Sequence, residues 1–147
     1  MIIDDDTIFA ALLRKCLAKY TKDAVHVYSS TIEIIHTPLT APYLVFIDYH
    51  MNDLNGLSTA RLVRKKWGKK VVIILISASD RILKIPISKY GIDKCISKKI
   101  GLDAIAQDGL KMYKSVKTRR TVKKILIIIL LLSTFIFLAI KLIPFFQ

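Results

Sequence analysis

The sequence predicts an α/β fold, a doubly wound five-stranded parallel sheet, followed by one carboxyl-terminal transmembrane helix. Short apolar runs bounded by turn-forming residues alternate with segments of helical periodicity. Near-continuous apolar runs are typical of parallel strands that are covered by helices on both faces. A late uncharged run, residues 125–140, is much longer than these strands and reaches most of the way across a bilayer.

The expected elements alternate regularly along the chain, which is the pattern of a parallel sheet. Strands are expected at residues 1–3, 24–28, 43–47, 71–77 and 94–97. Helices are expected at residues 4–20, 31–37, 57–67 and 80–91, and a last one begins near Gly101. Pro86 lies inside the fourth of these helices and should shorten or kink it.

Positive charge is concentrated directly before the long apolar run. All eleven acidic residues lie within residues 1–109, whereas residues 110–124 carry seven Lys or Arg and no acid. A basic block beside a membrane helix stays on the cytoplasmic side. We therefore expect a single-pass membrane protein with a cytoplasmic domain at residues 1–116, a basic juxtamembrane segment at 117–124 and a transmembrane helix at 125–146.

Two other interpretations of this region are weaker. The run could instead be a core helix of the domain, but a helix at the edge of a small domain should show a polar stripe, and this run is apolar on every face. The basic block could bind nucleic acid, but the apolar run that follows it favours a membrane surface, so we expect no nucleic-acid partner. The opening "MIIDDD" lacks the basic and apolar regions of a signal peptide, and none is expected.

Polar residues follow the predicted strands at the edge where parallel strands end together. They are Asp4, Asp5 and Asp6 after the first strand, Asp48 after the third, Ser77 at the end of the fourth and Lys98 after the fifth. A lone Asp48 would more simply cap a helix or begin a turn. Converging carboxylates, however, repel one another unless a cation lies among them, and Mg²⁺ with oxygen ligands keeps water positions that a phosphoryl oxygen can take. The pattern predicts that Asp48 accepts a phosphoryl group as a nucleophile.

Four stretches, "IIDDD", "FIDYHMNDLNG", "LISAS" and "GIDKCISKK", resemble the motifs of receiver domains of bacterial two-component response regulators. The resemblance covers residues 1 to about 116 and implies a flavodoxin-like receiver fold for them. It implies that Asp48 is the phosphoacceptor, that Asp5 binds Mg²⁺ directly and Asp4 through water, and that the backbone carbonyl of His50 completes the protein ligands.

The same resemblance implies that Ser77 is the switch hydroxyl and that Lys98 contacts the phosphoryl group. Asp6 lies outside the metal-binding pair and is expected to cap a helix. The chain departs from the family pattern at four positions: Asn52 and Lys99 replace prolines, Cys95 replaces an aromatic residue, and Pro86 interrupts the helix before the fifth strand. These changes retain the phosphoryl chemistry but alter the face that relays the signal in many relatives.

We therefore expect a phosphorelay component rather than an enzyme. A sensor histidine kinase or a phosphotransfer protein would be its partner, and we expect no DNA-binding output domain after the receiver. The alternative is a pseudo-receiver, a membrane-anchored docking module that is not phosphorylated. A phosphatase of the haloacid dehalogenase type is disfavoured, because that family has an aspartate two residues after the nucleophile, where this chain has His50. The sequence does not predict the oligomeric state.

Overall fold

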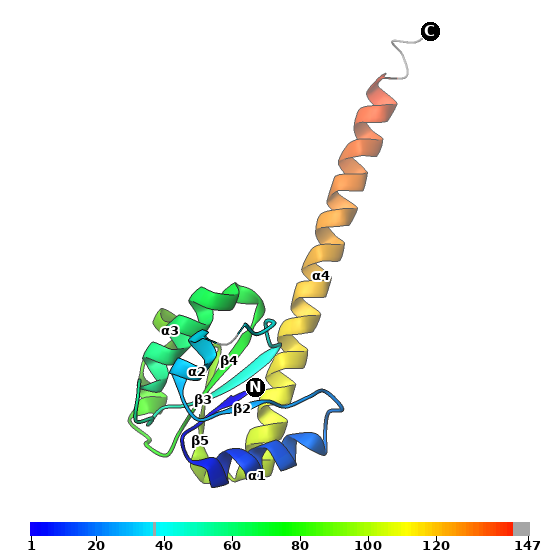
Figure 1. Ribbon diagram of the computed structural model, residues 1–147. Helices are drawn as coiled ribbons and strands as arrows, with labels where there is room; N and C mark the ends of the chain where they lie inside the picture. Colours follow the sequence, from blue (N-terminus) through cyan, green and yellow to red (C-terminus); the bar gives the residue numbers. More distant parts are fainter. Residues whose placement is uncertain (37, 143–147) are drawn as a thin grey trace. The chain divides into compact units, whose positions relative to one another are not determined.

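The computed structural model describes residues 1–36 and 38–142, with side chains described as far as Thr134 (Figure 1). The chain divides into two compact units, Met1–Tyr113 and Lys114–Gln147. The first unit contains the whole sheet.

The first unit is a five-stranded parallel sheet in the order β2-β1-β3-β4-β5, which confirms the predicted fold class for this unit. The strands are β1 Ile2–Ile3, β2 Val27–Tyr28, β3 Leu44–Asp48, β4 Val72–Ser77 and β5 Lys94–Ser97. The α-helices are α1 Thr7–Ala18, α2 Thr31–His36, α3 Gly56–Trp67 and α4 Leu102–Leu142. Short 3₁₀ helices are η1 Gly68–Lys70, η2 Ile82–Lys84, η3 Ile87–Tyr90 and η4 Lys98–Ile100.

Helices cover both faces of the sheet (Figure 1), which explains why β3 and β4 are buried along their whole lengths. Successive strand residues point to opposite faces, so each strand needs apolar residues throughout. One face packs against α2 and α3 through Ile34, Ala60 and Val63. On the other, Gly109 of α4 lies so close to Phe46 that an added Cβ would be 2.2 Å from its ring. This helix therefore packs directly on the sheet only because residue 109 has no side chain.

The prediction of a helix over residues 80–91 is wrong. The structure has the two 3₁₀ helices η2 and η3 there, separated by Ile85 and Pro86. Proline has no N–H to donate and pushes the residue before it out of the helical region. Ile85 accordingly has an extended backbone, with φ −72° and ψ 142°. Pro86 was expected to shorten or kink an α-helix. Its effect is stronger, because no α-helical turn forms on either side of it.

An arginine fixes the loop that leads into β5. The guanidinium of Arg64, on α3, donates to the backbone carbonyls of Gly68, Val71 and Gly91 and forms an ion pair with Asp93 at 3.0 Å. Asp93 also accepts a hydrogen bond from the backbone N–H of Ile73 at 2.8 Å. A planar group with five donors suits several fixed acceptors. Arg64 therefore ties α3, the start of β4 and the approach to β5 together.

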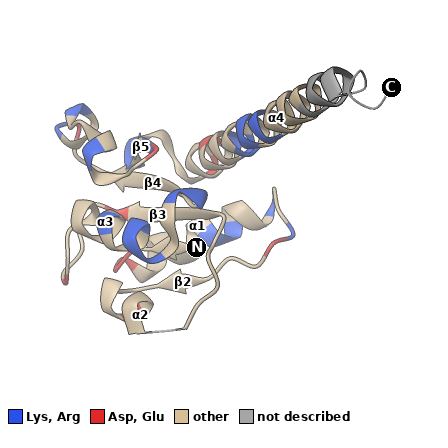
Figure 2. Ribbon diagram, turned by 90° about the horizontal axis from the view of Figure 1, so that it is seen from above, with Lys and Arg blue, Asp and Glu red and all other residues tan. Residues whose placement is uncertain are grey.

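In the second unit, α4 continues through the basic block into apolar residues (Figure 2). The side chains of Val122 and of residues 125–132 are all at least 47% exposed. In the part of the chain that the structure describes, no helix is both long and apolar enough to cross a membrane. The predicted transmembrane helix at 125–146 is therefore not supported. Residues 143–146 lie outside the described residues.

Candidate functional site

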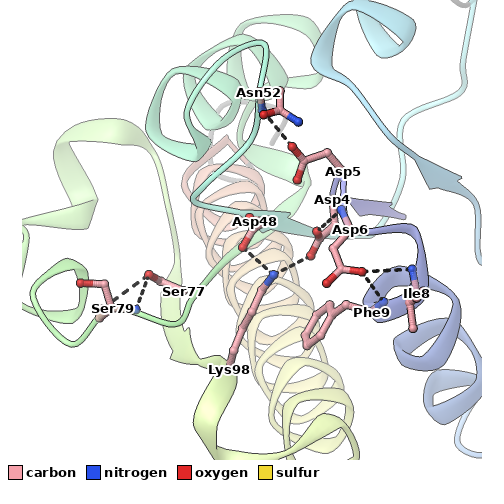
Figure 3. Close-up of polar contacts among 10 residues, drawn as sticks. All are labelled: Asp4, Asp5, Asp6, Ile8, Phe9, Asp48, Asn52, Ser77, Ser79 and Lys98. Atoms are coloured by element: carbon pink, nitrogen blue, oxygen red, sulfur yellow. Dashed lines mark hydrogen bonds and ion pairs between the residues drawn. The ribbon is translucent and has the colours of Figure 1, made fainter.

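Three of the predicted site residues meet at the carboxyl ends of the strands (Figure 3). Asp4 directly follows β1, Asp48 is the last residue of β3, and Lys98 directly follows β5. Because Ile3 pairs with Ile47 across the two parallel strands, the next residues, Asp4 and Asp48, lie side by side. Both are almost completely buried, with 1% and 4% of their surface exposed. The sheet register thus brings together two carboxylates that are far apart in the sequence.

The ammonium of Lys98 lies between these two carboxylates. Its Nζ is 3.0 Å from Oδ2 of Asp4 and 2.8 Å from Oδ1 of Asp48. Burial works against the charge of Lys98, but its hydrogen bonds to Asp48 and Asp4 outweigh burial and raise its pKa. Burial raises the pKa of Asp4, and the neighbouring Asp48 adds to this rise, while the hydrogen bond from Lys98 opposes it. Keeping both buried carboxylates ionised therefore costs free energy, and an additional cation in the site would reduce that cost.

Asp5 is the third carboxylate of the cluster. One oxygen from each of Asp4, Asp5 and Asp48 lies within 4.8 Å of the others, a grouping that can hold a metal ion. A hydrogen bond orients Asp5, because its Oδ2 accepts from the backbone N–H of Asn52 at 2.9 Å. A hard divalent cation such as Mg²⁺ prefers oxygen ligands of this kind and retains several waters. The donor set and the raised pKa of Asp4 fit such an ion.

Two local features hold these carboxylates in place. Asp6 is the N-cap of α1: its Oδ1 accepts hydrogen bonds from the backbone N–H groups of Ile8 and Phe9, which confirms the predicted cap. Gly56 begins α3 so close to the strand end that an added Cβ would lie 2.3 Å from the carbonyl oxygen of Asp48. The glycine at this position is therefore required by the loop that carries Asp48.

The structure places two other predicted residues nearby without joining them to the charge cluster. The hydroxyl of Ser77 is buried at the end of β4 and accepts a hydrogen bond from the backbone N–H of Ser79 at 3.0 Å. His50 is exposed in the loop after β3, where its ring meets that of Tyr49 edge to face at 4.6 Å. The switch role of Ser77 and the metal-ligand role of the His50 carbonyl stay predictions.

Some residues around the site could not be identified as partners from the sequence. The ring of Phe9 lies beside the ammonium of Lys98, with the Nζ 4.2 Å from its centroid. Lys99, at a position where the family usually has proline, forms an exposed ion pair with Asp80 at 2.7 Å. The only sequence signal that Phe9 lies near the site is its place in the first turn of the helix after Asp4. A helix that begins at a strand end has its first turn beside that end.

Comparisons with known proteins agree with this geometry. The family model of the response regulator receiver domain matches residues 1–108. No curated protein matches the chain.

Solved receiver structures share the fold. The receiver domain of the Francisella response regulator 1452 is 24% identical, with a TM-score of 0.64 over 78% of this chain and 95% of that one. The receiver domain of a putative Luxo repressor protein from Vibrio parahaemolyticus is 16% identical, with a TM-score of 0.70 over 82% and 93%. The response regulator TrrA from Thermotoga maritima, solved in complex with Mg²⁺ and BeF, is 22% identical, with a TM-score of 0.65 over 76% and 95%. With its parallel sheet, its strand-end carboxylates and this family match, the chain belongs to the response regulator receiver domain family.

Proposed function

We propose that the chain is a phosphoacceptor in two-component signalling and that Asp48 takes a phosphoryl group from a sensor histidine kinase or a phosphotransfer protein. The observation that carries the proposal is the position of Asp48: a buried carboxylate at a strand end, beside a second carboxylate and within 2.8 Å of an ammonium. The chain acts as a switch in this proposal and not as an enzyme with turnover.

The residues of the site divide the chemistry between them. An oxygen of Asp48 attacks the phosphorus of the donor phosphohistidine, a P–O bond forms, the P–N bond breaks, and the imidazole leaves. Lys98 donates to the phosphoryl oxygens and offsets their charge. Asp4 and Asp5, with Asp48 and the backbone carbonyl of His50, would hold Mg²⁺, which neutralises phosphoryl charge when it is bound. The hydroxyl of Ser77 would leave Ser79 to bond a phosphoryl oxygen.

Incubation of the full-length chain with acetyl phosphate tests this proposal. The intact mass should increase by one phosphoryl group in the presence of Mg²⁺, and the increase should be absent with EDTA. Asp48→Asn keeps the size of the side chain but removes the nucleophile, so it should gain no mass. A wild-type chain that never gains mass, with Mg²⁺ present, would favour the pseudo-receiver, a docking module without phosphorylation.

Attachment to a membrane through residues 125–146, with the receiver in the cytoplasm, is the second part of the proposal. Its support is the run of exposed apolar side chains at residues 125–132, directly after a block of seven Lys and Arg. Each basic residue near an anionic leaflet contributes about 1 kcal/mol of attraction. In this proposal the chain has no nucleic-acid partner.

Extraction of membranes with alkaline carbonate tests the attachment. A tagged full-length chain should stay in the pellet, and release into the supernatant would refute a spanning helix. In inside-out vesicles an amino-terminal tag should be cut by added protease, and a protected tag would refute the orientation.

A further inference from the structure

The phosphoryl-contacting lysine of the proposed site has a third neighbour that is not a carboxylate. The Nζ of Lys98 lies 4.2 Å from the centroid of the Phe9 ring, and Figure 3 shows that ring beside the end of the lysine side chain. The Lys98 side chain is only 19% exposed, so water screens this contact poorly. A cation over an aromatic face is attracted by the negative charge of that face, and more strongly where water is excluded.

The position of the Phe9 ring is fixed by the same residues that build the charge cluster. Oδ1 of Asp6 accepts a hydrogen bond from the backbone N–H of Phe9 at 3.0 Å, and the backbone N–H of Asp6 donates to Oδ1 of Asp4 at 3.0 Å. The other oxygen of Asp4 pairs with Lys98. One carboxylate therefore orients both the start of α1, which carries the ring, and the ammonium that the ring faces.

The ring differs from the other two partners of Lys98 in what else it can bind. Asp4 and Asp48 are both carboxylates that would bind a metal ion, and Asp48 would also carry the phosphoryl group. When their oxygens take these other partners, they hold the ammonium less strongly. A phenyl ring has no oxygen for a hard cation and no full negative charge to repel a phosphoryl group.

We propose that Phe9 is a positioning residue that keeps the ammonium of Lys98 in the site when the carboxylates are engaged by a divalent cation and a phosphoryl group. This inference rests on the proposed function of Asp48 and adds to it a residue on α1. It distinguishes the electrostatic role of the ring from simple packing, since an aliphatic side chain of similar size fills the space without attracting a cation.

Binding of beryllofluoride, a mimic of the phosphoryl group, to the full-length chain in saturating Mg²⁺ is the test. The dissociation constant follows from ¹⁹F NMR titration of wild type, Phe9→Leu and Phe9→Tyr. Phe9→Leu should bind about fivefold more weakly, equivalent to about 1 kcal/mol, because it loses the cation–π contact. Phe9→Tyr keeps the aromatic face and should stay within about twofold of wild type. The affinity for Mg²⁺ alone should be the same in all three chains.

Two further chains make the test specific. Phe9→Leu in a Lys98→Ala background should cause no additional weakening, because the ring then has no ammonium to hold. Ile8→Ala, a neighbour on α1 whose side chain is 73% exposed, should bind like wild type and controls for changes in the helix. Phe9→Met replaces Phe9→Leu if the leucine variant does not fold by circular dichroism.

The outcomes separate this inference from the function on which it rests. A wild-type chain that binds no beryllofluoride refutes the proposed function, and the role of Phe9 with it. If wild type binds and Phe9→Leu binds equally well, the proposed function stands and the positioning role is refuted. Equal weakening by Phe9→Leu and Phe9→Tyr, or weakening that persists without Lys98, would show that the ring acts through packing alone.

Discussion

Replacing Lys98 with methionine removes the ammonium that lies between Asp4 and Asp48 and leaves an apolar side chain of similar length. In wild type this ammonium is 3.0 Å and 2.8 Å from the two carboxylates, which are 1% and 5% exposed in their side chains. Removing one partner of a buried ion pair typically costs about 3–5 kcal/mol, because the remaining charge has lost both water and its partner. The variant should therefore be markedly less stable than wild type when no divalent cation is present.

Protonation limits that cost. At pH 7, neutralising a carboxylate of ordinary pKa costs about 4 kcal/mol, at about 1.4 kcal/mol per pKa unit. Asp4 can be neutralised at a lower cost, since burial has already raised its pKa. We expect Lys98→Met to lower the free energy of unfolding by about 2–4 kcal/mol in EDTA. Added Mg²⁺ should restore more stability to this variant than to wild type, because the ion then supplies the missing charge.

Urea unfolding of the full-length chain, followed by the fluorescence of Trp67, measures this loss. Trp67 packs against the core of the sheet unit, so its signal reports on the unit that holds the site. The matched control is Lys99→Met: Lys99 pairs with Asp80, both side chains are more than 60% exposed, and such pairs contribute at most about 1 kcal/mol. Equal, small losses for the two variants would refute the assignment of Lys98 as the cation of the site. A large loss for Lys99→Met alone would place the site lysine one residue later.

Three further predictions concern the residues that support the site. Arg64→Lys keeps a charge beside Asp93 but loses the planar guanidinium that donates to several carbonyls. It should lower the free energy of unfolding in urea by about 1–3 kcal/mol, and an unchanged stability would show that the guanidinium is dispensable. Gly56→Ala forces its Cβ against the carbonyl of Asp48. It should lower the free energy of unfolding by about 1–3 kcal/mol and weaken Mg²⁺ binding; unchanged urea and Mg²⁺ titrations would contradict the close approach of Gly56 to Asp48. In EDTA, stability should fall as pH rises through the raised pKa of Asp4, since the folded value lies above the unfolded one; Asp4→Asn should lack this fall, and parallel pH profiles would refute the shift.

The sheet was predictable because its central strands leave a strong pattern. β3 and β4 are buried on both faces, which demands continuous apolar runs, and the sequence shows them at residues 43–47 and 71–77. The second strand was expected over residues 24–28 but is only Val27–Tyr28, a half-buried strand at the sheet edge where burial imposes less pattern. The prediction of a helix over residues 80–91 was wrong because the helical spacing of apolar residues does not compensate for the hydrogen bond that Pro86 removes.

The charged part of the site was also predictable, for a topological reason. Strand ends of a parallel sheet share one edge, so the meeting of Asp4, Asp48 and Lys98 follows from the strand order and the positions of the strand ends. The side-chain partners do not follow from that rule. The contact of Phe9 with Lys98 depends on how α1 is rotated about its axis, and the bond of Ser77 to Ser79 depends on a loop conformation that no periodic pattern encodes.

Mapping the phosphorylated residue tests the central claim most directly. Borohydride reduction converts an aspartyl phosphate into homoserine, so digestion and mass spectrometry of the full-length chain, after acetyl phosphate and Mg²⁺, identify the acceptor. We predict homoserine at position 48, only when Mg²⁺ is present, and none at positions 4 and 5. Homoserine at position 4 or 5, or at no position despite Mg²⁺, would contradict the assignment of Asp48 as the phosphoacceptor.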